Sequence, residues 1–341
     1  MGCADEACGL NDDMKKEDLR IVFMGTPEFA VETLKALVEN GYDVVAVVTQ
    51  PDKPVGRHGS VLQPSPVKQY ALSQGLPVLQ PEKMKDPQFV EALRSYEANL
   101  QVVVAFRMLP EVVWAMPKYG TFNVHASLLP QYRGAAPINW AIINGDTRTG
   151  VTTFFLDHEI DTGRMILQEP FDIPDDADVE YVYDGLMHLG ANLCLRTIEA
   201  IIAADGKPAT TAQGVDAADA QCLRPAPKIF KETCQIQWQQ TVKQVYDFIR
   251  GLSPYPGAWT TLVAPDGKET VLKIFKGLPL ADARGTVTAV PGTIVAEKKH
   301  LYIACSDGLL QIESLQLAGK KRMDAQAFVN GMKNLENYSV R

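Results

Sequence analysis

Residues 19–204 alternate short β-branched runs with stretches of helical periodicity, and this alternation limits the possible folds more than any other feature. Strand-like runs cover 19–24, 42–49, 100–106 and 121–125, and helices are predicted between them. Units of strand, helix and strand with this spacing form right-handed crossovers and a parallel sheet. The sequence therefore predicts an α/β fold with a Rossmann-like, mostly parallel sheet that carries helices on both faces.

The second part of the chain has a different pattern. Residues 206–227 are rich in Ala, Gly, Pro, Asp and Gln and lack periodicity, which is typical of a linker. One helix and about five short strand-like runs with Gly/Pro turns follow, and they predict a small, OB-like β-barrel. We therefore expect a disordered N-terminal extension (1–18), an α/β domain (19–205), a linker (206–227) and a C-terminal β-barrel domain (228–341).

Composition excludes several classes of protein. Hydrophobic residues make up 46% of the chain, and its longest apolar runs, at 44–48 and 102–106, are far too short to span a membrane. The six cysteines form no C-x-x-C pair, which argues against a disulfide scaffold and favours a reducing cytoplasm. Residues 1–18 are polar and contain no apolar segment of a secretory signal.

Charge is distributed unevenly along the chain. Residues 225–341 contain 15 Lys and Arg against 10 Asp and Glu, although the whole chain has a net charge of −8. The basic C-terminal part fits a polyanionic partner, or else a lysine-rich surface exposed to solvent.

Two nucleotide-binding signatures are absent from the sequence. The first turn after a strand reads Gly25-Thr26-Pro27, without the G-x-G-x-x-G pattern that lets a pyrophosphate approach the backbone. No G-x-x-x-x-G-K-[ST] pattern occurs either. Dehydrogenase and kinase functions are therefore disfavoured.

Polar residues gather where the last predicted strand ends. Asn123 and His125 are two residues apart and so point to the same side of the strand, at the carboxyl end where open parallel sheets bind ligands. The turn Asp161-Thr162-Gly163 places a carboxylate at the same edge. The alternative for His125 is a structural role in which it satisfies a buried carbonyl group.

No Ser or Cys nucleophile stands beside these three residues. Asn and protonated His donate hydrogen bonds to an oxyanion, and Asp orients the His, so the set suits acyl transfer without a covalent enzyme intermediate. The neighbouring cluster of Asp157, His158 and Glu159 lacks the H-E-x-x-H pattern and is typical of surface polarity. We therefore predict no metal.

These motifs resemble those of the 10-formyltetrahydrofolate-dependent formyltransferases. The resemblance is carried by Asn123-x-His125, Ser127-Leu128-Leu129-Pro130, Tyr132-Arg133-Gly134 with Pro137, and Asp161-Thr162-Gly163. It extends to residues 24–27, 49–54 and 64–68, and in the second domain to 253–259 and 318–321.

The resemblance implies a formyl donor, 10-formyltetrahydrofolate, and an acceptor, the α-amine of methionyl initiator tRNA. It implies that Asn123, His125 and Asp161 are catalytic and that Ser127, Leu128, Leu129 and Pro130 line the folate site. It also implies that the insertion at 50–66 holds the tRNA through Arg57, and that the C-terminal domain binds tRNA. A cytoplasmic monomer with no stable protein partner and no membrane contact is expected.

Two rival functions are left open by the residues. One is a formyltransferase or deformylase that acts on a small molecule or a sugar nucleotide, against which the basic second domain argues. The other is a non-catalytic RNA-binding protein built on an enzyme fold, against which the complete set Asn123, His125 and Asp161 argues.

Overall fold

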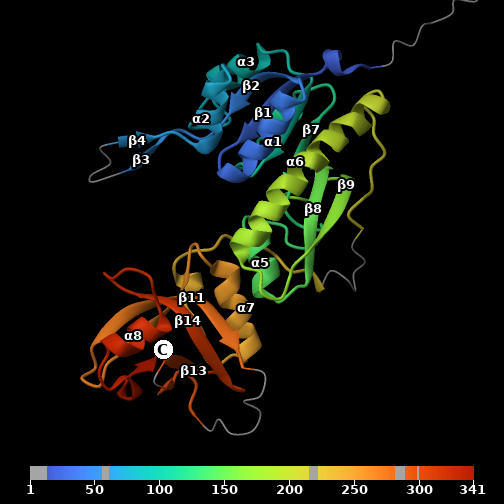
Figure 1. Cartoon of the computed structure of the whole chain (residues 1–341). Coiled ribbons are helices and arrows are strands. Elements are labelled where there is room, and N and C mark those ends of the chain that lie inside the picture. Colours follow the sequence, from blue (N-terminus) through green and yellow to red (C-terminus); the bar gives the residue numbers. More distant parts are fainter. Residues whose placement is uncertain (1–13, 56–60, 215–221, 281–288, 298) are drawn as a thin grey trace, which may run out of the picture. The chain divides into compact units, whose positions relative to one another are not determined.

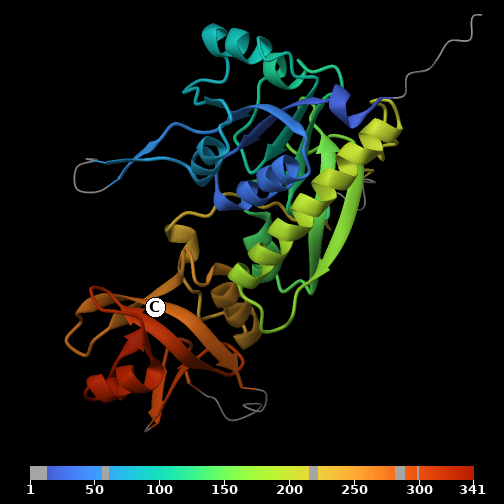
Figure 2. The same cartoon turned by 45° about the horizontal axis from the view of Figure 1, so that its top comes forward.

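A computed structural model describes residues 14–55, 61–214, 222–280, 289–297 and 299–341 (Figures 1 and 2). The chain forms two compact units, one within 1–125, 152–169 and 187–214 and the other within 126–151, 170–186 and 215–341. Residues 1–13 of the predicted N-terminal extension lie outside the described residues, whereas Lys16–Asp18 form a 3₁₀ turn.

The first sheet has the strand order β5-β2-β1-β6-β7-β8-β9. Its strands are β1 (Arg20–Gly25), β2 (Asp43–Val48), β5 (Val78–Leu79), β6 (Leu100–Val104), β7 (Thr121–His125), β8 (Arg148–Phe155) and β9 (Met165–Asp172). The first five strands in this order pair in parallel, and β8 pairs antiparallel with β7. The predicted Rossmann-like, mostly parallel sheet is therefore confirmed.

Helices cover this sheet, as predicted. They are α1 (Glu28–Glu39), α2 (Pro66–Ser73), α3 (Pro87–Arg94), α4 (Glu111–Trp114) and α6 (Val179–Ala203). Helix α5 (Pro137–Ile143) belongs to the second compact unit. Alternate residues of β1 point to opposite faces of the sheet, and all four from Ile21 to Met24 are fully buried, so both faces are covered. On one face Val22 and Met24 pack in a core that includes Phe89 of α3.

The strand β1 ends in a glycine that close packing requires. A Cβ atom at Gly25 would lie 2.7 Å from the Cβ of Ala30 and 3.0 Å from the carbonyl oxygen of Val104. The glycine is required because α1 packs directly against the strands here.

The segment at 50–66, expected as an irregular loop, contains a two-stranded antiparallel ribbon. Strand β3 (Lys53–Val55) pairs with β4 (Val61–Gln63), and both figures show the ribbon extending away from the first sheet. Strands of three residues are too short to show a recognisable alternation, which is why the sequence did not predict them. Arg57 lies outside the described residues.

The second sheet is the predicted C-terminal barrel. Its order is β12-β13-β14-β11-β10-β16, and its pairs are antiparallel. The strands are β10 (Ala258–Val263), β11 (Glu269–Pro279), β12 (Ile294–Glu297), β13 (His300–Ala304), β14 (Leu309–Leu317), β15 (Met323–Asp324) and β16 (Ser339–Val340). A bridge between Thr293 and Ser339 joins the two ends of the sheet, so the barrel is nearly closed.

Two helices accompany the barrel. The predicted α7 (Val242–Leu252) begins at a capping box in which Thr241 accepts a hydrogen bond from the backbone of Gln244. The short α8 (Ala325–Gly331) was not predicted. Buried residues of α7, α8 and the strands form one apolar core.

Helix α6 is the one described helix that is long and apolar enough to cross a membrane by length and composition. Core helices of soluble proteins meet the same criterion, and α6 packs Leu186, Leu193 and Ile198 with no exposed surface. Its Thr197 hydroxyl also lies 2.8 Å from that of Thr153 on β8.

Candidate active site

The structure brings together the side chains of His125 and Asp161. His125 ends β7, and Asp161 lies on the turn between β8 and β9. Their Nδ1 and Oδ2 atoms are 3.9 Å apart, which is within ion-pair range for a protonated imidazole but too long for a direct hydrogen bond. Both side chains are largely buried, at 7% and 12% exposure, so the pair is shielded from solvent screening.

The turn that carries Asp161 is held in an unusual conformation. Asp161 has a φ of 55°, in the left-handed region that few non-glycine residues adopt. The side-chain amide of Gln213 donates to the carbonyl oxygens of Asp161 and Gly163, at 2.9 and 2.8 Å. At the start of the turn, the Asp157 carboxylate accepts a hydrogen bond from the Thr162 hydroxyl at 2.8 Å. These bonds hold the backbone of the turn that carries Asp161.

Asn123 lies two residues before His125 on the same strand, as predicted. Its Oδ1 atom is buried and has no hydrogen-bond partner within the described part of the chain. Most buried polar atoms are paired, so an unpaired amide oxygen two residues from a buried histidine indicates a place for a ligand group that donates a hydrogen bond. The ring of Phe154, on neighbouring β8, contacts His125 edge-on at 6.4 Å between centroids.

Arg107 is a candidate that the sequence analysis missed. It follows β6, beside β1, at the point where the order of the sheet reverses and where open α/β sheets bind ligands. Its guanidinium donates to the carbonyl oxygens of Glu82, at 2.9 Å, and Pro81, while its buried Nε has no partner within the described residues. Burial lowers the pKa of Arg107. The signal in the sequence was its position directly after a buried strand.

The loop after β7 contains the four predicted folate-binding residues. Ser127 is fully buried, and its hydroxyl donates to the carbonyl oxygen of Gln131 at 2.7 Å. Leu129 is 3% exposed, whereas Leu128 and Pro130 are half-buried. Leu128 and Pro130 therefore have side-chain surface available to a ligand.

An acidic residue anchors the base of the β3–β4 ribbon. Asp52 accepts hydrogen bonds of 2.7 Å from both Lys68 and Gln80. These bonds, that of Lys68 above all, hold the pKa of the Asp52 carboxyl below its ordinary value. The charge of Lys68 is neutralised by this pair, whereas Lys53 on the ribbon is exposed.

Within the described ranges, no three or more His, Cys, Asp or Glu side chains are arranged to hold a metal ion. The cluster of Asp157, His158 and Glu159 is divided between other contacts. His158 pairs with Glu111 at 3.8 Å and meets the Trp114 ring edge-on at 5.3 Å.

Comparison with known proteins agrees with this arrangement along the chain. Residues 19–198 match the formyl transferase family model, and residues 228–333 match that of the formyl transferase C-terminal domain. Two solved structures share the fold. HypX from Aquifex aeolicus in complex with tetrahydrofolic acid gives a TM-score of 0.59 at 20% identity, covering 91% of this chain and 47% of that one. WlaRD, a sugar 3N-formyl transferase, gives a TM-score of 0.61 at 18% identity, covering 89% of this chain and 99% of that one.

Some relatives are much more similar in sequence. The methionyl-tRNA formyltransferase of Parabacteroides distasonis is 62% identical over 329 residues, which cover 96% of this chain and 100% of that protein. That of Bacteroides fragilis is 59% identical over 329 residues, covering 96% and 99%. With such similarity over nearly its whole length, the chain belongs to the methionyl-tRNA formyltransferase family of the formyl transferases.

Proposed function

We propose that the chain transfers the formyl group of 10-formyltetrahydrofolate to the α-amino group of methionyl initiator tRNA, which yields formylmethionyl-tRNA for translation initiation. The observation that carries this proposal is the buried pair of His125 and Asp161, with the buried, unpaired Oδ1 of Asn123 on the same strand as His125 within the described residues. The names of its close relatives support the acceptor, and the tetrahydrofolic acid bound to HypX supports a folate donor.

In the proposed mechanism, the neutral α-amine attacks the formyl carbon of the donor. An ordinary α-amino group has a pKa of about 8, so a neutral fraction exists at physiological pH and no strong base is required. The new C–N bond forms while the carbonyl oxygen becomes an oxyanion. Collapse of this intermediate breaks the bond to N10 of the folate, and the proton lost by the amine ends on N10.

Three side chains act on that intermediate. The amide N–H of Asn123 and a ring N–H of His125 donate hydrogen bonds to the oxyanion. Asp161 positions the imidazole, at 3.9 Å, and assists proton removal from the attacking amine. Burial strengthens each of these interactions, because the surrounding dielectric is lower than that of water.

Ser127–Pro130 form the proposed binding segment for the folate donor, since they directly follow the catalytic strand and expose part of Leu128 and Pro130. Arg107 is a further candidate for this donor because its buried Nε lacks a partner within the described chain. A guanidinium N–H matches the acceptor groups of a pterin or a glutamate.

The barrel carries a face that suits the tRNA. Trp259 of β10 lies opposite Lys273 of β11, and Arg322 stacks 4.4 Å from the centroid of the Phe275 ring. Tyr255 is 81% exposed. Cations interleaved with aromatic rings contact phosphates and bases without requiring a particular sequence. Arg57 is proposed to add a phosphate contact.

The proposed acceptor places the protein in the cytoplasm, where charged tRNA occurs. We propose that it acts there as a monomer, without a stable protein partner and without membrane contact.

A formyl-transfer assay tests the function directly. Purified protein would receive 10-formyltetrahydrofolate with methionyl initiator tRNA, with the same tRNA uncharged, or with a nucleotide-linked amino sugar. We expect formylation of the charged tRNA alone. Formylation of the amino sugar in place of the tRNA would establish the rival, small-molecule acceptor, and inactivity toward all three would favour the non-catalytic alternative.

A further inference from the structure

A segment with linker composition is hydrogen-bonded to the loop that follows the catalytic strand. This segment, Cys222–Pro227, is named the strap here. The carbonyl oxygen of Ala226 accepts hydrogen bonds from the backbone of Ala135, at 2.7 Å, and Ala136, at 3.1 Å. The backbone N–H of Ala226 donates to the carbonyl oxygen of Arg133 at 2.9 Å, so the strap and the loop form a short β-bridge.

Two residues of the loop have positive φ angles and contact the strap directly. Tyr132 has a φ of 60°, in the left-handed region that residues other than glycine rarely adopt. Its N–H donates to the Arg224 carbonyl oxygen at 2.8 Å. Gly134 has a φ of 127°, and a Cβ there would lie 2.5 Å from the Ala226 oxygen. The strap backbone therefore packs directly against the loop backbone at Gly134, where a side chain would clash.

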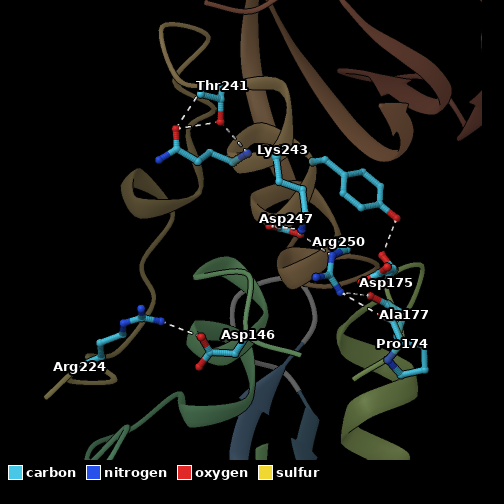
Figure 3. A network of polar contacts seen from close by, with 11 residues as sticks. Asp146, Pro174, Asp175, Ala177, Arg224, Thr241, Lys243, Asp247 and Arg250 are labelled. Carbon is cyan, nitrogen blue, oxygen red and sulfur yellow. Dashed lines mark hydrogen bonds and ion pairs between the residues drawn. The ribbon is translucent and has the colours of Figure 1, made fainter. Parts of the chain in front are cut away.

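One carboxylate clamps the two segments together (Figure 3). Asp146, which follows α5, accepts a hydrogen bond from the Tyr132 hydroxyl at 2.6 Å through one oxygen. Its other oxygen accepts from Nη1 of Arg224 at 2.7 Å, as drawn in Figure 3. Removal of either Arg224 or Asp146 breaks the same clamp.

The clamp connects with the proposed folate-binding residues through Gln131. The backbone N–H of Arg224 donates to the side-chain oxygen of Gln131 at 2.9 Å. The main-chain oxygen of Gln131 in turn accepts the hydrogen bond of the Ser127 hydroxyl, at 2.7 Å. Ser127 stands two residues after His125 in the chain. These two hydrogen bonds therefore lead from the strap to a residue that directly follows the catalytic strand.

We propose that the strap is a positioning device for the loop at 127–136, and that Arg224 is a positioning residue for formyl transfer. This inference rests on the function proposed above. It assigns Arg224 a role in the folate half of the reaction, although a cation in a tRNA-binding protein would ordinarily be assigned to phosphate contact. The Asp146 carboxylate already neutralises its charge.

Hydrogen exchange tests whether the clamp holds the loop. The N–H groups of Tyr132, Ala135 and Ala136 are bonded to the strap, so their peptide reports its docking. In the full chain we expect Arg224→Ala to accelerate exchange there by about tenfold. The matched control is Arg148→Ala, which removes another Arg–Asp pair of 2.9 Å on the exposed surface and leaves the loop protected. Unchanged exchange in Arg224→Ala would overturn the proposal.

Kinetics test whether the held loop matters for the reaction. Arg224→Ala and Asp146→Ala should each lower kcat/KM for the folate donor by about tenfold, since small misplacements of a binding group reduce turnover strongly. The double variant should lose no more than either single variant, because both remove one clamp. Arg224→Lys should recover part of the loss.

The salt dependence of tRNA kinetics separates positioning from phosphate contact. For positioning, the slope of log KM for tRNA against log salt stays at the wild-type value in Arg224→Ala. A slope reduced by about one, with normal folate kinetics, would identify a phosphate contact and overturn the proposal. If Arg224→Ala does not fold, Tyr132→Phe removes one clamp bond with less disturbance and should show the same folate effect. A wild-type protein without formyl transfer would refute the proposed function, while the exchange measurement would still report on the strap.

Discussion

At the scale of single residues, the proposed chemistry depends on one strand and one turn. His125 and Asp161 come from segments 36 positions apart in the sequence, yet their side chains meet at 3.9 Å. We expect His125→Ala, Asp161→Ala and Asn123→Ala each to lower kcat by at least ~100-fold, the usual loss for an oxyanion or acid–base group. Single-turnover formyl transfer to charged tRNA measures this directly.

The chain offers a matched control for the histidine. His158 lies on the same turn as Asp161, is exposed, and pairs with Glu111. His158→Ala should retain wild-type turnover. Near-normal turnover in a folded His125→Ala protein would refute the catalytic assignment, and melting curves of all variants would show that they are folded.

Asp52 gives a prediction for pH dependence. Its pKa is lowered in the folded protein by the hydrogen bonds from Lys68 and Gln80, so the unfolded chain binds its proton at higher pH than the folded chain does. The stabilisation is therefore present above the unfolded pKa of about 4 and is lost as pH falls through the lower, folded pKa. Asp52→Asn should melt below wild type at pH 7, and the difference should shrink as the pH falls below about 4.

Other carboxylates titrate equally in both proteins, so the difference in Tm isolates Asp52. The control is Asp43→Asn, which removes the partner of a 3.5 Å surface pair with Arg20 and should change Tm little at either pH. A gap between wild type and Asp52→Asn that persists unchanged at pH 3 would show that the pair does not act through ionisation.

The site could be predicted only where one element carries the signal. Asn123 and His125 share a strand face by the alternation of side chains, and the Asp161 turn was recognisable by its glycine. The proximity of His125 and Asp161 is confirmed, whereas the catalytic roles of all three residues stay predictions. Arg107 could not be found this way, because its significance comes from an unpaired Nε that depends on burial by distant residues.

At the scale of secondary-structure elements, long periodic segments were predictable and short ones were not. Helices α1, α2 and α3 lie between the predicted strands, and α7 is the helix predicted before the barrel strands, because each repeats its apolar residues over two turns or more. The three-residue strands β3 and β4 have no such repeat. The antiparallel pairing of β8 with β7 also depends on the tertiary path of the chain, which local sequence does not determine.

The β3–β4 ribbon carries a prediction about tRNA. The segment at 50–66 has two lysine or arginine residues, Lys53 and Arg57, so no neighbouring cation can replace the contact of Arg57. We expect Arg57→Ala to raise KM for charged tRNA several-fold and to reduce the salt slope by about one, with little change in folate binding. The control Arg94→Ala alters an exposed arginine of α3 that is paired with Glu91. Equal tRNA kinetics in wild type and Arg57→Ala would remove the ribbon from the proposed tRNA interface.

At the scale of the whole molecule, the chain is less divisible than its composition suggests. Residues 206–227 have the composition of a linker, yet Ala226 is fully buried against the loop at 133–136. Helix α7 packs on α5, where the side-chain amide of Asn139 donates to the Gly251 carbonyl oxygen at 2.8 Å. Composition cannot reveal these contacts, since backbone hydrogen bonds carry no side-chain signature.

A buried ion pair strengthens this attachment. Asp247 and Arg250 are 3% and 6% exposed, and Oδ1 of Asp247 accepts from Nε of Arg250 at 2.8 Å. Nη1 of Arg250 donates to the Ala177 carbonyl oxygen at 2.9 Å. The Tyr246 hydroxyl donates to the backbone carbonyl oxygen of Asp175, also at 2.9 Å (Figure 3). A charge removed from water in this way is maintained only while all its partners remain.

These attachments lead to a prediction for a chain that ends at Pro225. The truncation removes the barrel with its basic and aromatic face, so formylation of charged tRNA should be abolished. It also removes Ala226, which leaves the N–H groups of Ala135 and Ala136 without acceptors, and it uncovers the apolar side chain of Ile143 that packs against Gly251. The truncated chain loses these backbone hydrogen bonds and this apolar packing, so we expect Tm to fall by at least about 5 °C. Calorimetry and the tRNA assay on both chains check the two parts. A truncated protein that formylates charged tRNA as well as the full chain would exclude the barrel as the tRNA platform, and an unchanged Tm would show that the first 225 residues fold independently of the rest.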